Sequence, residues 1–263
     1  MVGESPRYAA PAAACAAQVL RELAKAGHPL SLSDLERATG RSKTLVFRSL
    51  RELENLQFVV RVPDRRYRLG LSAFEVGAAF ITQPDIDDSV RATLRRLADD
   101  SGESANLGVL RSNEVLYLMK FESRASFVTL SRVGGRVPAT CTAIGKALLA
   151  MLDPEQLRTT FSDPLPQMTS DSICGLDELE RDLALTRERG YAVDMGEAVP
   201  GRGGLAVTIP FLGDDARWAA ISLSTDIDRI RDEKLGTLLD MLLDAKTRII
   251  REMETRRAFF GAG

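Results

Sequence analysis

Basic and hydrogen-bonding side chains concentrate between Ser31 and Gly70, in a stretch suited to contact a polyanion. Arginine and lysine bind phosphate oxygens, while arginine, serine and threonine also reach base edges in a DNA groove. Residues 1–70 hold 12 Lys+Arg against 7 Asp+Glu, whereas residues 71–263 hold 23 against 30. This segregation of charge predicts that the N-terminal region binds double-stranded DNA. The candidate contacts are Ser42, Lys43, Thr44, Phe47, Arg48, Arg51, Arg61, Arg65, Arg66 and Arg68.

Two short helices would position the first part of this set. The run Ser33-Asp34-Leu35-Glu36 matches a capping box, in which a serine and a glutamate satisfy each other's backbone N–H groups. It predicts a helix from about Asp34 to Thr39, with Leu35 and Ala38 buried. Gly40 suits a left-handed C-terminal cap, which reverses the chain sharply.

A second helix is predicted from an N-cap at Ser42 to about Asn55. Val46, Leu50 and Leu53 share one side of such a helix, so the basic residues lie on the opposite side. Two helices across a glycine-containing turn, the second with an outward basic face, are typical of a helix-turn-helix. In that motif the second helix enters a major groove.

A hairpin is predicted directly after the second helix, with strands at 58–62 and 66–69 joined by a turn at Pro63-Asp64. Its arginines lie where a wing would contact phosphates or a minor groove. A first helix over about residues 11–27 completes this winged helix-turn-helix. The alternative is a small helical domain with a solvated charged face, and the charge segregation argues against it.

Three runs of residues carry a resemblance to a known family. They are Gly40-Arg41-Ser42-Lys43-Thr44-Leu45-Val46-Phe47-Arg48-Ser49-Leu50, Tyr67-Arg68-Leu69-Gly70 and Thr142-Ala143-Ile144-Gly145-Lys146-Ala147-Leu148-Leu149-Ala150. With them the chain resembles the IclR family of bacterial transcriptional regulators. The family usually has a leucine where Arg41 stands and a Ser-Thr pair where Thr44-Leu45 stands. The resemblance therefore does not carry over an operator sequence.

The rest of the chain predicts an α+β domain built on an antiparallel sheet, because strands and helices are mixed along it. The resemblance implies that this is an effector-binding domain. Strands are expected at 105–110, 114–120, 127–131, 191–195, 205–211 and 217–224. Helices are expected at 85–100, 142–151 (with Met151 facing inward), 176–189 and 227–256.

A helix over Ser72–Ile81, with Phe74 and Ala78 on one face, would join the two parts. The expected organisation is a DNA-binding domain at 1–70, a linker helix at 71–83 and an effector-binding and oligomerisation domain at 84–263. The resemblance implies a homodimer or homotetramer that associates through the linker helix. The alternative is that this helix packs only on its own domain.

The strand after residue 217 is the best candidate for the wall of a ligand pocket. Alternation places Ala219, Ile221 and Leu223 on one face, and Ser222 and Ser224 with Trp218 and Ala220 on the other. Two hydroxyls beside small and aromatic groups are typical of a pocket for a small polar ligand. Serines on an exposed sheet face are an equally common outcome.

Backbone amides offer a second set of candidate ligand contacts. The start of the helix after Thr142 would present free N–H groups at Ala143, Ile144 and Gly145, which suit a carboxylate. The glycine-rich stretch 200–204 would form a loop with inward N–H groups, to which Arg202 adds charge.

The resemblance implies that Ala143, Ile144, Asp194, Ser222 and Ser224 line a pocket for small organic acids. A cysteine common in that pocket falls at Gly203 or Gly204, and its loss would enlarge the space. Glu197 is a further carboxylate near this site, with surface charge as the alternative interpretation.

Residues 71–263 contain no histidine, because the only one is His28. Ser-His catalysis and histidine-based metal sites are therefore not expected in that region, although Ser-Lys pairs remain possible. The cysteines at 15, 141 and 174 lack the spacing of a disulfide framework or zinc site, which fits a reducing cytoplasm. No cofactor, metal or membrane span is expected. Two alternatives to effector sensing remain for the C-terminal domain: an enzyme, or an oligomerisation module without a ligand.

Overall fold

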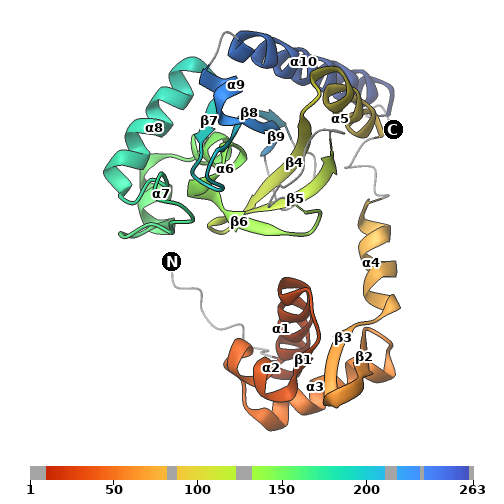
Figure 1. The fold of residues 1–263 in the computed structure, drawn as a ribbon. Helices are drawn as coiled ribbons and strands as arrows, with labels where there is room; N and C mark the ends of the chain where they lie inside the picture. Colours follow the sequence, from red (N-terminus) through yellow and green to blue (C-terminus); the bar gives the residue numbers. More distant parts are fainter. Residues whose placement is uncertain (1–9, 82–87, 123–131, 211–217, 232–233, 261–263) are drawn as a thin grey trace. The chain divides into compact units, whose positions relative to one another are not determined.

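The computed structural model describes residues 10–81, 88–122, 132–210, 218–231 and 234–260. The chain divides into two compact units, Met1–Gln83 and Pro84–Gly263 (Figure 1). The fold is mixed α+β, as the sequence predicts.

The first unit is a helical core with a small antiparallel sheet. Its buried side chains come from the first three helices and from the hairpin, and they include Leu35, Val46 and Leu50. The elements are α1 (Pro11–Ala26), β1 (Leu30–Ser31), α2 (Leu32–Thr39), α3 (Lys43–Asn55), β2 (Val59–Val62), β3 (Arg66–Leu69) and α4 (Leu71–Ile81). The strand order in the small sheet is β1-β3-β2. This is a winged helix-turn-helix, with β2 and β3 as the wing.

The capping box of α2 differs from the prediction. It is formed by Ser31 and Asp34, so the helix begins at Leu32 and Ser33 lies exposed within it. Ser31 adopts the extended cap conformation because it pairs with Arg66 of β3, which fixes the backbone two residues before the predicted box. Ala38 is exposed, so its predicted burial is wrong; Leu35 is fully buried, and the half-buried Leu32 also packs against the core.

The turn between α2 and α3 follows the prediction. Gly40 adopts φ +63°, and its N–H donates to the carbonyl of Glu36. Glycine adopts this left-handed conformation without the steric cost that a side chain brings. Helix α3 buries Val46, Leu50 and Leu53 as predicted, although the Ser42 side chain makes no capping hydrogen bond.

The second unit is a six-stranded antiparallel sheet with helices on both faces (Figure 1). Its strand order is β6-β5-β4-β9-β8-β7. The strands are β4 (Ser104–Arg111), β5 (Glu114–Phe121), β6 (Arg136–Pro138), β7 (Ala192–Met195), β8 (Arg202–Pro210) and β9 (Trp218–Asp226). One face packs against α5 (Asp88–Ser101), α9 (Ile227–Arg231) and α10 (Lys234–Phe260), and the other against α6 (Ala143–Leu149) and α8 (Leu176–Arg189). Helix α7 (Pro154–Thr160) joins the same hydrophobic cluster as α6 and α8.

Several boundaries in this unit differ from the predictions. The predicted strand 127–131 lies outside the described residues, while β6 and α7 were not predicted. Met151 is 43% exposed rather than buried, because α6 ends at Leu149. The stretch 200–204 is not a loop throughout, since β8 begins at Arg202 and pairs with both β7 and β9.

Candidate DNA-binding surface and effector cavity

The outward face of α3 carries the predicted groove contacts. Thr44, Phe47, Arg48 and Arg51 are exposed on the side opposite the buried stripe, and Phe47 is 45% exposed. Ser42 and Lys43, at the start of the helix, are also exposed. The helix is held by its apolar side against the core, so its polar side is free for a DNA groove.

The wing presents its four arginines to solvent. Arg66 and Arg68 share the sheet face that points away from Tyr67, and Arg65 lies in the turn between the strands. Arg61 pairs with Tyr67 and shares its face, yet its side chain is exposed. Arg66 differs from the others because its Nη1 donates to the carbonyl oxygen of Pro29 at 3.3 Å. This bond links the wing to the segment before α2.

Arg41, one of the residues that differ from the pattern of the resemblance, turns toward α1. Its Nε donates to Oε1 of Gln18 at 3.0 Å, and the side chain is half-buried. The substitution therefore adds a link between α1 and the turn that sets the start of α3.

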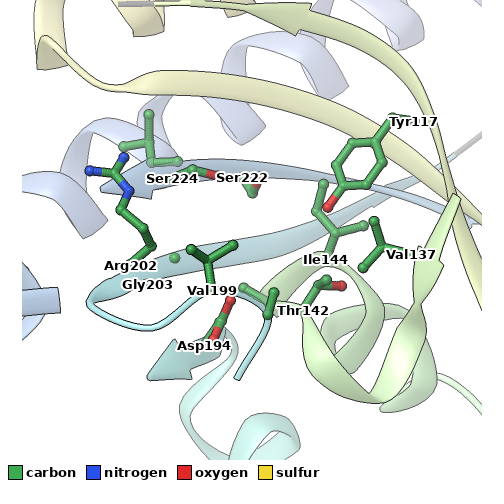
Figure 2. Close-up of a pocket in the computed structure, with 14 residues that line it drawn as sticks. Tyr117, Val137, Thr142, Ile144, Asp194, Val199, Arg202, Gly203, Ser222 and Ser224 are labelled. Carbon is green, nitrogen blue, oxygen red and sulfur yellow. The ribbon is translucent and has the colours of Figure 1, made fainter. Parts of the chain in front are cut away.

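A cavity of about 60 Å³ lies between the sheet and α6 in the second unit (Figure 2). One water needs about 10–15 Å³ of such a cavity, so this volume corresponds to about four to six water-sized groups. Of the seven predicted effector residues, six line it: Ala143, Ile144, Asp194, Gly204, Ser222 and Ser224.

Gly145 is the predicted residue that the cavity does not include. Its N–H donates to Oγ1 of Thr142 at 3.0 Å, so the expectation that this N–H is free is wrong. A Cβ at Gly145 would lie 2.0 Å from the carbonyl oxygen of Ala139. Glycine is required here because α6 packs directly against the backbone of the preceding turn.

Ser222 and Ser224 project from β9 on the α6 side of the sheet, as the alternation predicts. The side-chain nitrogen of Asn106 donates to both hydroxyl oxygens, at 3.3 Å to Ser222 and 3.1 Å to Ser224. A hydroxyl that accepts in this way keeps its own hydrogen for another acceptor. The fully buried Asn106 thus leaves two hydroxyl donors for the cavity.

Asp194 lines the cavity from the end of β7. Its Oδ1 accepts from the backbone N–H groups of Gly196 at 3.1 Å and Glu197 at 2.8 Å. Burial raises the pKa of Asp194 to about 7, although these two hydrogen bonds oppose the shift. The carboxyl group is therefore poised between its charged and neutral forms near neutral pH.

A buried ion network supports the loop after Asp194. Lys146, only 1% exposed, places its Nζ 2.5 Å from Oε1 of Glu197 and 3.3 Å from Oδ2 of Asp182 on α8. Burial raises the pKa of Glu197, and the Lys146 ammonium opposes that shift. Ser172 Oγ also donates to the Glu197 carbonyl at 2.6 Å. These bonds fix the loop whose N–H groups donate to Asp194.

Two further cavity residues, Tyr117 and Arg202, complete the wall at its edges. Figure 2 shows them at opposite sides of the view, with Ser222 and Ser224 between them. Burial and the nearby Asp194 carboxylate raise the pKa of Tyr117 well above its usual value, so its hydroxyl stays protonated. The guanidinium of Arg202 bonds Asp226 through Nη1.

Asn106 and Tyr117 are not among the residues predicted for the site. Asn106 is a single amide in the otherwise apolar run Ala105–Leu110, which is a usable signal. Nothing in the local sequence marks Tyr117, because tyrosine is common in strands.

The family model described as the bacterial transcriptional regulator IclR C-terminal matches residues 78–251. The chain belongs to the IclR family. A MarR-family model matches residues 11–68, the helix-turn-helix region. Membership and the winged helix-turn-helix together make the protein a DNA-binding transcriptional regulator.

Known regulators are similar to this chain along nearly its whole length. The HTH-type transcriptional regulator XynR of Escherichia coli is 30% identical, over 88% of this chain and 92% of its own length. The probable transcriptional regulator SauR of Cupriavidus necator is 32% identical, over 89% and 94%. The solved IclR regulator of Alicyclobacillus acidocaldarius is 29% identical, with a TM-score of 0.80 over 93% of this chain and 99% of that one.

No helix among the described residues is long and apolar enough to cross a bilayer. Nor do the described histidine, cysteine, aspartate and glutamate side chains gather into a metal-binding group of three.

Proposed function

We propose that this IclR regulator senses a small organic acid in the cavity between β9 and α6, and that occupancy changes its affinity for operator DNA. The observation that carries the proposal is the pair of hydroxyl donors. Asn106 holds both serine oxygens as acceptors, so their hydrogens suit a carboxylate in the cavity. Arg202 contributes positive charge at the rim.

The size of the cavity supports a ligand of a few carbons. A structure with the same fold, an IclR homologue from Microbacterium hydrocarbonoxydans, is complexed with 4-hydroxybenzoate, which is itself a carboxylic acid. The amides of Ala143 and Ile144 would add backbone donors. Helix α6 has seven residues, so its dipole adds little to this site.

The ten exposed residues on α3 and the wing would hold the operator, with α3 in a major groove and the wing arginines on phosphates or in a minor groove. We propose association through α4 as well, because its apolar side chains are unusually exposed. Leu71, Phe74 and Val76 are 76%, 72% and 61% exposed. A homodimer would match a two-fold symmetric operator.

An operator can be obtained by selecting bound fragments from random DNA, with and without a panel of small carboxylic acids. Binding of that operator is then titrated with an active acid in the wild type and in the variant Ser222→Ala with Ser224→Ala. Each lost hydrogen bond to a charged ligand should weaken acid binding about 10- to 100-fold. DNA affinity without acid should not change.

Thr247→Ala is the matched control, because its hydroxyl bonds the carbonyl of Leu243 on its own helix. By linkage, the acid and the operator must change each other's affinity by the same factor. A double serine variant that responds to acid like the wild type would exclude this cavity as the sensor. A wild type that binds acid with no effect on DNA would exclude the coupling.

A further inference from the structure

The guanidinium of Arg202 has one side engaged and one side free. Its Nη1 bonds Asp226, while its Nε and Nη2 atoms are buried and have no hydrogen-bond partner among the described residues. Nε and Nη2 together form the side edge of the guanidinium, whose two parallel N–H groups match the two oxygens of a carboxylate. Buried donors of this kind are normally satisfied.

The residue that carries this edge lines the cavity, although its Nε and Nη2 atoms are themselves covered by protein atoms. Arg202 lies two residues before Gly204 on β8, so the two share a sheet face with Ser224, the cross-strand partner of Gly204. That face is the one against α6, and Arg202 is part of the cavity wall. Asp226, which engages the other side of the guanidinium, has a side chain that is 66% exposed, so solvent screens its charge.

An acceptor faces the same space. Asp194 pairs with Gly204 on the opposite side from Ser224, so its carboxyl lies on the same sheet face. A plain carboxylate ligand would be repelled by an ionised Asp194, whereas a ligand hydroxyl or ammonium would donate to it. Burial raises the pKa of Asp194 to about 7 although its Oδ1 already accepts from two backbone N–H groups, so a further donor from a ligand would stabilise the ionised form.

We propose that the ligand is a small carboxylic acid that also bears a hydrogen-bond donor, a hydroxyl or an ammonium group. The Nε–Nη2 edge of Arg202 binds its carboxylate, and Asp194 accepts from its donor. This assignment rests on the proposed function, because it names the chemistry of the ligand at the same cavity. It also gives the ligand a defined orientation in the cavity, which the hydroxyl groups of Ser222 and Ser224 alone would not set.

Calorimetry on the full-length protein tests the donor requirement with matched acids. The three-carbon set is propionate, pyruvate, L-lactate and L-alanine, and the four-carbon set is butyrate with its 2-oxo, 2-hydroxy and 2-amino derivatives. At least one donor-bearing acid should bind about tenfold or more tightly than its oxo and unsubstituted partners, because it makes one additional hydrogen bond to a charged group. In Asp194→Asn this preference should shrink to a few-fold.

The role of Arg202 is tested with two variants and a control. Arg202→Gln should weaken binding of the preferred acid about 10- to 100-fold, and Arg202→Lys should lose part of that affinity because it keeps the charge without the fork. Arg158→Gln removes another ion-paired arginine of the same unit, outside the cavity, and should bind like the wild type. Circular dichroism confirms that each variant is folded.

The outcomes separate this assignment from the proposed function. Wild-type binding without preference for a donor, or Arg202→Gln binding that equals the wild type, overturns the assignment and leaves acid sensing intact. A wild type that binds none of the eight acids overturns both.

Discussion

Replacing Lys146 with methionine tests whether the buried ion network supports the cavity. Lys146 is 1% exposed, and its ammonium lies between Glu197, itself 4% exposed, and Asp182. Methionine preserves most of the volume but leaves the Glu197 carboxylate without its cation. Breaking a buried ion pair by removing one partner costs about 3–5 kcal/mol of unfolding free energy. Asp182 retains contact with water and adds less, because its side chain is 24% exposed.

The loss of unfolding free energy in Lys146→Met should change with pH in a defined direction. Burial raises the pKa of Glu197 above its unfolded value, and the Lys146 ammonium opposes that rise. Without Lys146 the folded pKa rises further, so the native state binds a proton that the unfolded state releases. Stability is therefore lost as pH rises from the unfolded pKa through the folded pKa, at up to about 1.4 kcal/mol per pH unit. The deficit of Lys146→Met should be largest near pH 8 and should shrink toward pH 5.5.

Urea unfolding followed by circular dichroism at pH 5.5 and pH 8 measures both effects. Lys146→Met combined with Glu197→Gln is the matched rescue, because the neutral amide needs no cation and should recover most of the loss at pH 8. Equal unfolding free energies for Lys146→Met and the wild type at pH 8 would refute the reasoning. So would a deficit that does not change with pH.

Two further predictions concern DNA binding and assembly. Arg48→Ala and Arg51→Ala should each weaken operator binding and lower the salt slope by about one unit if the residue contacts a phosphate. Arg21→Ala on the exposed side of α1 should change neither, and unchanged binding in both α3 variants would place the interface elsewhere. Phe74→Glu should shift the protein toward monomer in light scattering, because it puts a charge into the proposed α4 contact, whereas Glu75→Gln should not. A wild type that is monomeric at all concentrations would exclude that contact.

Local periodicity explains what the sequence could predict. The buried stripe Val46, Leu50 and Leu53 depends only on the helical repeat, and the placement of Ser222 and Ser224 on one face depends only on strand alternation. The capping box of α2 was misplaced because two serines offer similar boxes. The choice of Ser31 depends on its pairing with Arg66, which is 35 residues away in the chain and has no local signal.

Contacts between residues far apart in the chain also explain why parts of the cavity could not be predicted. Asn106 reaches Ser222 across 116 residues of sequence, and only the pairing of β4 with β9 brings them together. Lys146 is charged in an otherwise apolar helix, and the sequence gives no indication that Glu197 and Asp182 neutralise it. Both cases involve buried polar groups whose partners come from distant elements, and buried polar groups must find such partners.

Gly204 shows how one absent side chain can shape the proposed ligand site. Cross-strand pairing places Asp194, Gly204 and Ser224 in one row on the face toward α6, with the glycine in the middle. Neighbouring strands lie about 4.8 Å apart, so about 10 Å of backbone separates Asp194 from Ser224. A Cβ at Gly204 would point toward Ala143 at 3.6 Å and would begin to fill the space between the acceptor and the hydroxyl wall. Because Gly204 has no side chain, the proposed ligand would have room to contact Asp194 and Ser224 at once, as a two-ended acid requires.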